Sequence, residues 1–196
     1  MLKNPHVYTR LQEEIDQADA QGRLSESVTF AESHTLPYLI AVTREAMRIH
    51  PSVSFSMPRL VPPGGAILCN EYFPVGVTVG CNPYVVHRDR TVFGEDADAF
   101  KPERRLSERR AKEMEKAIIT FGGGARTCIG KNISLMEMQK LVPQLMRYFE
   151  FELADPMAEW ETRNHWFNSQ RGVFVNVKVR RKIDLVVVWS KEAQMV

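Results

Sequence analysis

The chain has 196 residues, of which 44% are hydrophobic and 26% are charged, and these proportions are ordinary for a globular protein. Its formal net charge of +2 is too small to indicate a nucleic acid or an anionic membrane as a partner. Structural zinc is not expected, because Cys69, Cys81 and Cys128 show no Cys-x-x-Cys spacing. An odd cysteine count without a secretory signal favours a reducing compartment, and no apolar run is long enough to cross a bilayer.

The first predicted element is an amphipathic helix that begins at Asn4-Pro5 and ends near Ala18. Its apolar stripe consists of Val7, Leu11 and Ile15, which recur every four residues. Because this helix starts almost at the first residue, we expect its packing partners to lie outside the chain. Residues 19–34 are polar and irregular.

A second helix is predicted from Leu36 to Ile49, ended by Pro51. It contains Glu45 and Arg48, which are three residues apart and share a helix face. Such a pair is usually exposed and worth a few tenths of a kcal/mol. Its neighbours here are apolar, which favours a buried pair, and losing one partner of a buried pair costs about 3–5 kcal/mol.

Short strands are predicted next. Val53 to Leu60 is apolar and extended, and the runs 67–69 and 77–79 flank Phe73-Pro74-Val75-Gly76 as in a β-hairpin. A short helix is expected at 82–87, a mostly solvated charged stretch at 108–116, and a strand from Val173 to Val179.

A long helix is predicted from Lys131 to Tyr148. Its inward face is expected to carry four apolar residues, and the internal Pro143 should kink the helix or end its regular hydrogen bonding. The four inward residues are Ile133, Met136, Leu141 and Leu145.

The loop Phe121-Gly122-Gly123-Gly124-Ala125-Arg126-Thr127-Cys128-Ile129-Gly130 precedes that helix. Its glycines permit positive φ and close backbone approach to a flat ligand. The helix N-terminus favours the thiolate of Cys128, and the planar fork of Arg126 suits a carboxylate. Together, the glycines, the thiolate and the arginine indicate a haem-binding site. A phosphate loop does not fit, because its glycine spacing is wrong and Asn132 follows Lys131. A glycine-rich turn with a buried cysteine stays open as an alternative.

The loop matches the pattern Phe-x-x-Gly-x-Arg-x-Cys-x-Gly of the cytochrome P-450 superfamily at every fixed position. Glu45 and Arg48 match that family's Glu-x-x-Arg, and Pro102-Glu103-Arg104 its Pro-Glu-Arg. Residues 4–180 therefore resemble the C-terminal portion of a microsomal, fungal-like member. The resemblance implies a mainly α fold with small β-sheets (α+β), with residues 1–181 as the haem-ligating portion and 182–196 as an atypical tail.

The resemblance also implies roles for single residues. Cys128 would be the axial iron ligand of haem b, and Arg126 and Arg59 would each bind a propionate. The remaining implied roles form three sets. These are the cofactor loop residues Phe121, Gly122, Ile129 and Gly130, a buried charge triad of Glu45, Arg48 and Arg104, and substrate-lining positions Val53, Ser54, Phe55 and Phe167. For the substrate-lining positions ordinary core packing stays an open alternative.

The implied activity is insertion of one oxygen atom from O2 into a small apolar substrate, with an NADPH-dependent reductase as partner. The implied location is the cytoplasmic face of the endoplasmic reticulum membrane. Members are usually more than twice as long, so we expect the N-terminal part, including the helix over the distal haem face, to be missing. A non-catalytic fragment and a haem-thiolate isomerase or dehydratase are alternatives. Arg105 departs from the family, which usually has an aromatic residue there.

Overall fold

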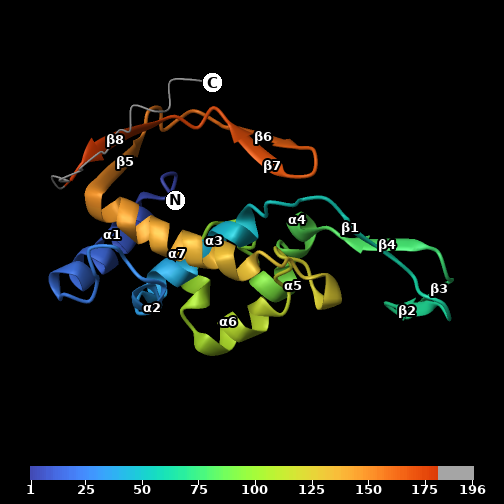
Figure 1. Cartoon of the computed structure of the whole chain (residues 1–196). Helices are drawn as coiled ribbons and strands as arrows, with labels where there is room; N and C mark the ends of the chain where they lie inside the picture. The colour runs from blue at the N-terminus through green and yellow to red at the C-terminus, as the bar shows by residue number, and fades with distance from the viewer. Residues whose placement is uncertain (181–196) are drawn as a thin grey trace, which may run out of the picture.

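The computed structural model describes residues 1–180, and its centre is a group of packed helices. Helices α1 (Pro5–Ala20), α3 (Pro37–Ile49) and α7 (Lys131–Tyr148) pack on one another, and the short α2 (Phe30–Ser33) lies against α7 (Figure 1). The three predicted long helices are confirmed. The mixture of helices with small antiparallel sheets also confirms the α+β fold class.

The partners of α1 lie within the chain, so the expectation that they lie outside it is wrong. Val7, Leu11 and Ile15 are completely buried. They belong to one apolar cluster with residues of α3 and α7, such as Leu39 and Met146. The cluster joins helices that are far apart in the sequence, and the periodicity within one helix does not show such contacts.

The predicted inward face of α7 is wrong as well. Ile133 and Leu141 are 58% and 56% exposed, and Met136 and Leu145 are also exposed. The buried residues of α7 are Leu135, Gln139, Pro143, Met146 and Arg147. The helix continues through Pro143 to Tyr148, so the proline does not end it.

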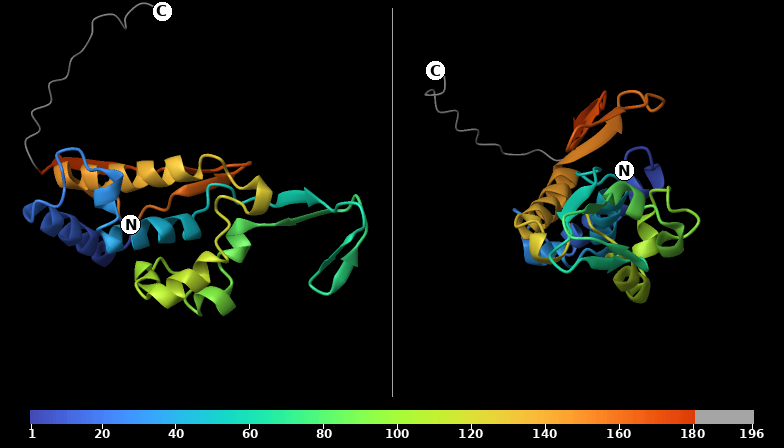
Figure 2. Two further views of the ribbon diagram at one scale, coloured as in Figure 1. Left: turned by 60° about the horizontal axis from the view of Figure 1, so that its bottom comes forward. Right: turned by 90° about the vertical axis from the view of Figure 1, so that its right-hand side faces the viewer.

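The strands form two-stranded antiparallel sheets within residues 1–180. The predicted hairpin around 73–76 is wrong. Instead β1 (Met57–Leu60) pairs with β4 (Thr78–Cys81), and β2 (Ala66–Leu68) pairs with β3 (Glu71–Phe73) in between. The tight turn of the inner hairpin is Cys69-Asn70, where both residues have positive φ. Figure 2 shows this ribbon projecting from the helices.

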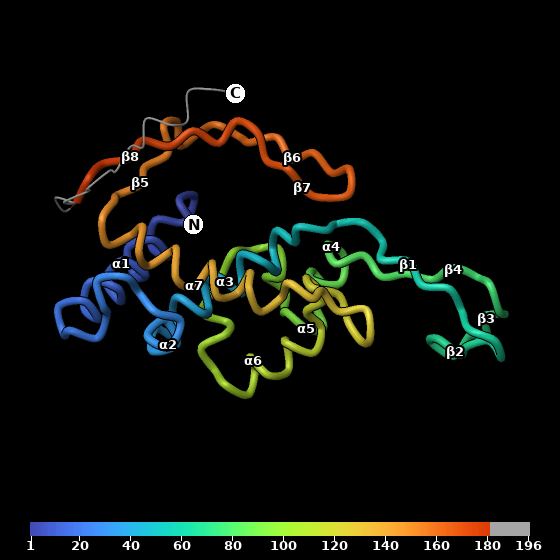
Figure 3. Tube along the Cα trace, in the orientation of Figure 1, coloured from blue at the N-terminus to red at the C-terminus, as the bar shows by residue number. Residues whose placement is uncertain are grey.

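Two further sheets follow α7. Strand β5 (Phe149–Leu153) pairs with β8 (Val175–Val179), which confirms a strand in the predicted terminal region, and β6 (Glu161–Asn164) pairs with β7 (Asn168–Arg171). The β6–β7 hairpin returns toward the chain that follows α3 (Figure 3). The predicted tail at 182–196 lies outside the described residues.

A second group of short helices packs beside α3. It contains α4 (Pro83–Val86), α5 (Arg90–Phe93), the 3-10 turn η1 (Pro102–Arg105) and α6 (Glu108–Glu115). Phe93, Ala97 and Met114 form its small apolar core, and the rest of α6 is mainly solvent-facing, as its charge predicts. Among residues 1–180, no helix has the length and apolar character needed to cross a membrane.

Candidate functional site

The predicted cysteine loop opens onto a cavity of about 650 Å³, which lies within the usual size range of ligand pockets. The loop forms one wall, β1 a second, and the chain after α3 with the tip of the β6–β7 hairpin a third. Its lining is Met47, Ser52, Val53, Met57, Pro58, Arg59, Thr120, Phe121, Gly122, Arg126, Cys128, Ser134, Met138, Trp166 and Phe167.

Backbone hydrogen bonds fold the loop around Cys128. The Cys128 N–H donates to the Phe121 carbonyl at 2.8 Å, and the Cys128 carbonyl accepts from Lys131 N at 3.2 Å, at the start of α7. Gly122 and Gly124 have φ values of 74° and 63°, a region that favours glycine. The Cys128 side chain is consequently exposed on the cavity side of a helix N-terminus.

Two other predicted loop residues lie apart from the cavity lining. Ile129 is fully exposed, and its side chain does not line the cavity. Gly130 is the N-cap of α7, and a Cβ there would lie 3.7 Å from the Cys128 Sγ. A side chain at position 130 would therefore meet the sulfur.

Two arginines from different elements reach the same cavity. Arg126 ends the 3-10 turn η2 (Gly124–Arg126), and Arg59 lies in β1. The Arg59 Nη1 donates to the Pro58 carbonyl at 2.8 Å. Within residues 1–180 neither guanidinium forms an ion pair with a carboxylate, so both can bind an anionic group.

The hairpin tip is fixed to the chain after α3 by Asn168. Its backbone N–H donates to the Ser52 carbonyl at 2.7 Å, and its side-chain amide donates to the Pro51 carbonyl at 2.8 Å and to the Ser54 hydroxyl. Val53 and Phe167 form a β-bridge beside these bonds. This clamp holds the apolar third wall of the cavity together.

The predicted substrate-lining residues divide into two pairs. Val53 and Phe167 line the cavity. Ser54 is buried in the Asn168 clamp, and Phe55 is 52% exposed with its ring 6.2 Å from that of Trp166. Trp166, the neighbour of Phe167 at the predicted turn, lines the cavity too. The sequence interpretation missed Asn168, whose contacts with residues 51–54 have no local signal in the sequence.

The side chains of the charge triad are almost completely buried. Arg48 Nη2 lies 2.7 Å and Arg104 Nε 2.8 Å from the same Glu45 oxygen, and none of the three side chains is more than 3% exposed. Arg104 also pairs with Asp96 at 2.9 Å. Glu45 in α3 thus binds two arginines, and Arg104 in η1 binds two carboxylates. These ion pairs connect α3 to η1 and to the chain before η1.

Arg105 enters the same cluster with poorer geometry. Its Nε lies 3.7 Å from Glu45 and its Nη1 lies 3.5 Å from Glu115, while Nε and Nη2 are buried with no hydrogen-bond partner among the described residues. Burial lowers the pKa of Arg105, against the opposing effect of the two carboxylates.

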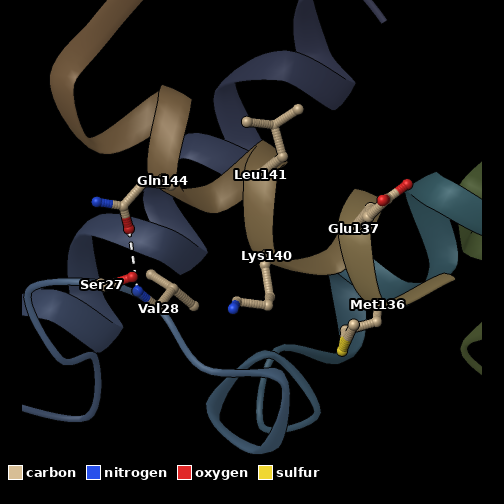
Figure 4. A pocket seen from close by; sticks show the side chains of 7 residues that line it. All are labelled: Ser27, Val28, Met136, Glu137, Lys140, Leu141 and Gln144. Carbon is tan, nitrogen blue, oxygen red and sulfur yellow. Dashed lines mark hydrogen bonds between the residues drawn. The ribbon is translucent and has the colours of Figure 1, made fainter. Parts of the chain in front are cut away.

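A second hollow, of about 430 Å³, lies on the outer side of α7 (Figure 4). It is lined by Met136, Leu141 and the chain at Ser27 and Val28, and the Val28 N–H donates to the Gln144 amide oxygen at 3.0 Å. This hollow contains no thiol and no arginine. The cavity at Cys128, which has both a thiol and arginines in its lining, is therefore the candidate functional site.

The donor set at Cys128 suits one particular kind of metal centre. No group of three or more His, Cys, Asp or Glu side chains in the described part of the chain could hold a metal ion. A single thiol instead suits a metal whose other ligands belong to a cofactor.

Comparison with known proteins agrees with this geometry. The family model described as cytochrome P-450 matches residues 1–177. Similar curated proteins include the cytochrome P-450 monooxygenase cicH of Emericella nidulans, 44% identical over 93% of this chain and 37% of that protein. The monooxygenase gsfF of Penicillium aethiopicum is 46% identical over 92% of this chain and 36% of its own length. The chain thus spans little more than a third of these relatives.

Proposed function

Because the chain belongs to the cytochrome P-450 family, we propose that it forms the haem-ligating C-terminal portion of a haem-thiolate monooxygenase. The reaction would insert one oxygen atom from O2 into a small apolar substrate. The observation that carries this proposal is the meeting of the Cys128 thiol with Arg59, Arg126 and an apolar wall in one cavity.

The residues at the cavity fit haem b. The donor set is one thiol for the iron and, for the propionates, two guanidiniums that form no ion pair with residues 1–180. A Cβ at Gly122 would stand 3.5 Å from the Arg126 carbonyl and 3.9 Å from the Met57 sulfur, so glycine keeps this part of the loop thin. When bound, the haem would supply the oxygen chemistry, with electrons from an NADPH-dependent reductase.

The chain's own residues would bind the cofactor, orient it and shield it from water. Cys128 would donate its thiolate from a loop whose backbone is fixed at Phe121 and at α7. Arg126 and Arg59, from two different walls of the cavity, would hold the cofactor by its propionates. Val53, Trp166 and Phe167 would present an apolar surface, which excludes water and selects an apolar substrate. A reductase partner and a place at the endoplasmic reticulum membrane belong to this proposal too.

Replacement of single cysteines tests the proposal. Reduced, carbon monoxide-treated chain with added haem should show the red-shifted Soret band of thiolate ligation. Cys128→Ser should abolish that band, whereas Cys69→Ser and Cys81→Ser, both at exposed thiols, should keep it. If Cys69→Ser removes the band instead, the ligand assignment is wrong.

The same preparation distinguishes the alternatives. A chain that binds no haem would be a non-catalytic fragment. A haem-loaded chain that converts substrate without consuming NADPH would be an isomerase or a dehydratase. Substrate oxidation in step with NADPH consumption, after addition of a reductase, would support the monooxygenase.

A further inference from the structure

His87 is a completely buried residue that directly follows α4. Its Nε2 lies 2.9 Å from the backbone nitrogen of Ile119, and its Nδ1 lies 3.3 Å from the carbonyl oxygen of Arg48. A backbone N–H can only donate, so Nε2 is the acceptor. The ring hydrogen is therefore assigned to Nδ1, which donates to Arg48. A neutral ring in this single tautomer satisfies both neighbours.

The bond between His87 and Arg48 is reciprocal. Arg48 Nη1 donates to the His87 carbonyl at 2.7 Å, while Arg48 Nε and Nη2 bind Glu45. His87 is thus attached to the buried charge cluster through both its backbone and its ring. Its Nε2 faces away from that cluster, toward the segment that enters the cysteine loop.

From Ile119 the hydrogen bonds continue to the proposed iron ligand. The Ile119 carbonyl accepts from Gly122 N at 2.9 Å and closes a turn. Within that turn, the Phe121 carbonyl accepts from Cys128 N at 2.8 Å. A path of short contacts therefore runs from Glu45 through His87 to the backbone of Cys128.

We propose that His87 is a positioning residue for the Cys128 loop, because its ring fixes the point at which the turn 119–122 begins. The inference rests on the proposed function for the identity of the ligand, but not for the hydrogen bonds. A histidine that merely filled space would need its volume alone. Here each ring nitrogen has a partner from a different part of the fold.

Two substitutions separate positioning from space filling. In His87→Gln the side chain is long enough to keep an acceptor for Ile119. In His87→Asn the shorter side chain reaches the Arg48 carbonyl alone. In the 196-residue chain without haem, we expect the Ile119 and Gly122 amides to exchange hydrogen about tenfold faster in His87→Asn and near the unmodified rate in His87→Gln.

The haem-loaded chain gives the second readout. His87→Asn should move the reduced carbon monoxide spectrum from the thiolate band toward the thiol band, and His87→Gln should retain the thiolate band. His34→Asn, at an exposed histidine, is the matched control and should change neither readout. If His87→Asn exchanges at the unmodified rate and keeps the band, the proposal is overturned.

A measurement on the unmodified chain covers the case in which His87→Asn does not fold. The ¹⁵N shifts of the His87 ring should show hydrogen on Nδ1 and a bare Nε2. A ring with hydrogen on Nε2 would overturn the proposal. If the unmodified chain shows no thiolate band, the proposed function fails, while the exchange rates and the ring tautomer still decide the role of His87.

Discussion

Every nitrogen of the Arg48 guanidinium donates a hydrogen bond, although the side chain is completely buried. Nε and Nη2 bind Glu45, and further bonds reach the backbone carbonyls of His87 and Ala99. A buried charge is tolerated when it is paired in this manner, because each lost water contact is replaced.

Arg48→Ala should therefore lower the free energy of unfolding by about 3–5 kcal/mol, since it leaves Glu45 short of a partner and several carbonyls unpaired. Urea unfolding of both chains measures the difference. The control is Arg109→Ala, which removes an exposed pair with Glu113 at 4.0 Å and should leave the midpoint unchanged. Equal midpoints for Arg48→Ala and Arg109→Ala would show that the buried cluster adds no stability.

His87 should make the fold sensitive to mild acid. Burial lowers its pKa to about 4 from an ordinary value of 6.5, and the charges of Arg48, Arg105 and Arg88 act in the same direction. Between these values the unfolded chain binds the extra proton and the folded chain does not, so stability falls as the pH falls. The loss between about pH 6.5 and 4 should approach ~3 kcal/mol.

Urea titrations at pH 7 and at pH 4.5 measure this loss. The His87→Gln chain lacks the titrating group and should lose correspondingly less stability over the same interval. If both chains lose the same amount, other groups are responsible for the acid sensitivity.

At the scale of elements, the face of α7 that packs against the core is not the face predicted from the sequence. Periodicity locates the helix well, because apolar residues recur at helical spacing along most of its length. It does not show which apolar stripe meets the core when several stripes are present. Met146 is 1% exposed and contacts the α1 stripe, while Leu141 is 56% exposed.

A pair of lysine substitutions tests this assignment. Leu141→Lys should change the free energy of unfolding by no more than about 0.5 kcal/mol, because the side chain already faces solvent. Met146→Lys should cost about 3 kcal/mol or more, because it places a charge in the apolar cluster. Thermal melting of both variants measures the effects, and the reverse ranking would favour the face predicted from sequence.

The strand pairing and one wall of the site also depend on contacts between distant residues, which neighbouring residues in the sequence do not reveal. A hairpin at 73–76 is the simplest local pairing, but β4 returns to β1 and encloses the inner hairpin, which turns at Cys69-Asn70. The loop residues were predictable because one short motif contains them. The Asn168 clamp was not, because it joins residues more than a hundred positions apart in the sequence.

Across the whole molecule, the first helix contacts the β5–β8 sheet and the residue that follows it. Arg180 pairs with Asp16 at 2.7 Å, and the Phe151 N–H donates to the Tyr8 hydroxyl at 3.1 Å. Both bonds are made by residues of α1, the helix that buries its stripe in the apolar cluster. The helix that supplies the stripe is therefore attached to β5 and to the residue after β8 as well as to the cluster.

Deletion of residues 1–22 should abolish cooperative unfolding, because it uncovers the apolar side chains of α3 and α7 that α1 now buries. Circular dichroism during heating and binding of a hydrophobic dye measure the result. Glu13→Gln, at an exposed position of α1, should behave like the unmodified chain. A truncated chain with a sharp transition would show that α1 is dispensable.

The reciprocal bonds of Arg48 and His87 restrict how this protein can change over generations. Each residue holds the other's carbonyl, so a substitution at either position leaves the remaining one with an unmet buried group. Both acceptors are backbone carbonyls, which remain whatever side chain is present, so a second substitution does not relieve the group that the first left unpaired. A lineage therefore cannot recover the lost stability by changing the partner residue, and we expect selection to retain both side chains together.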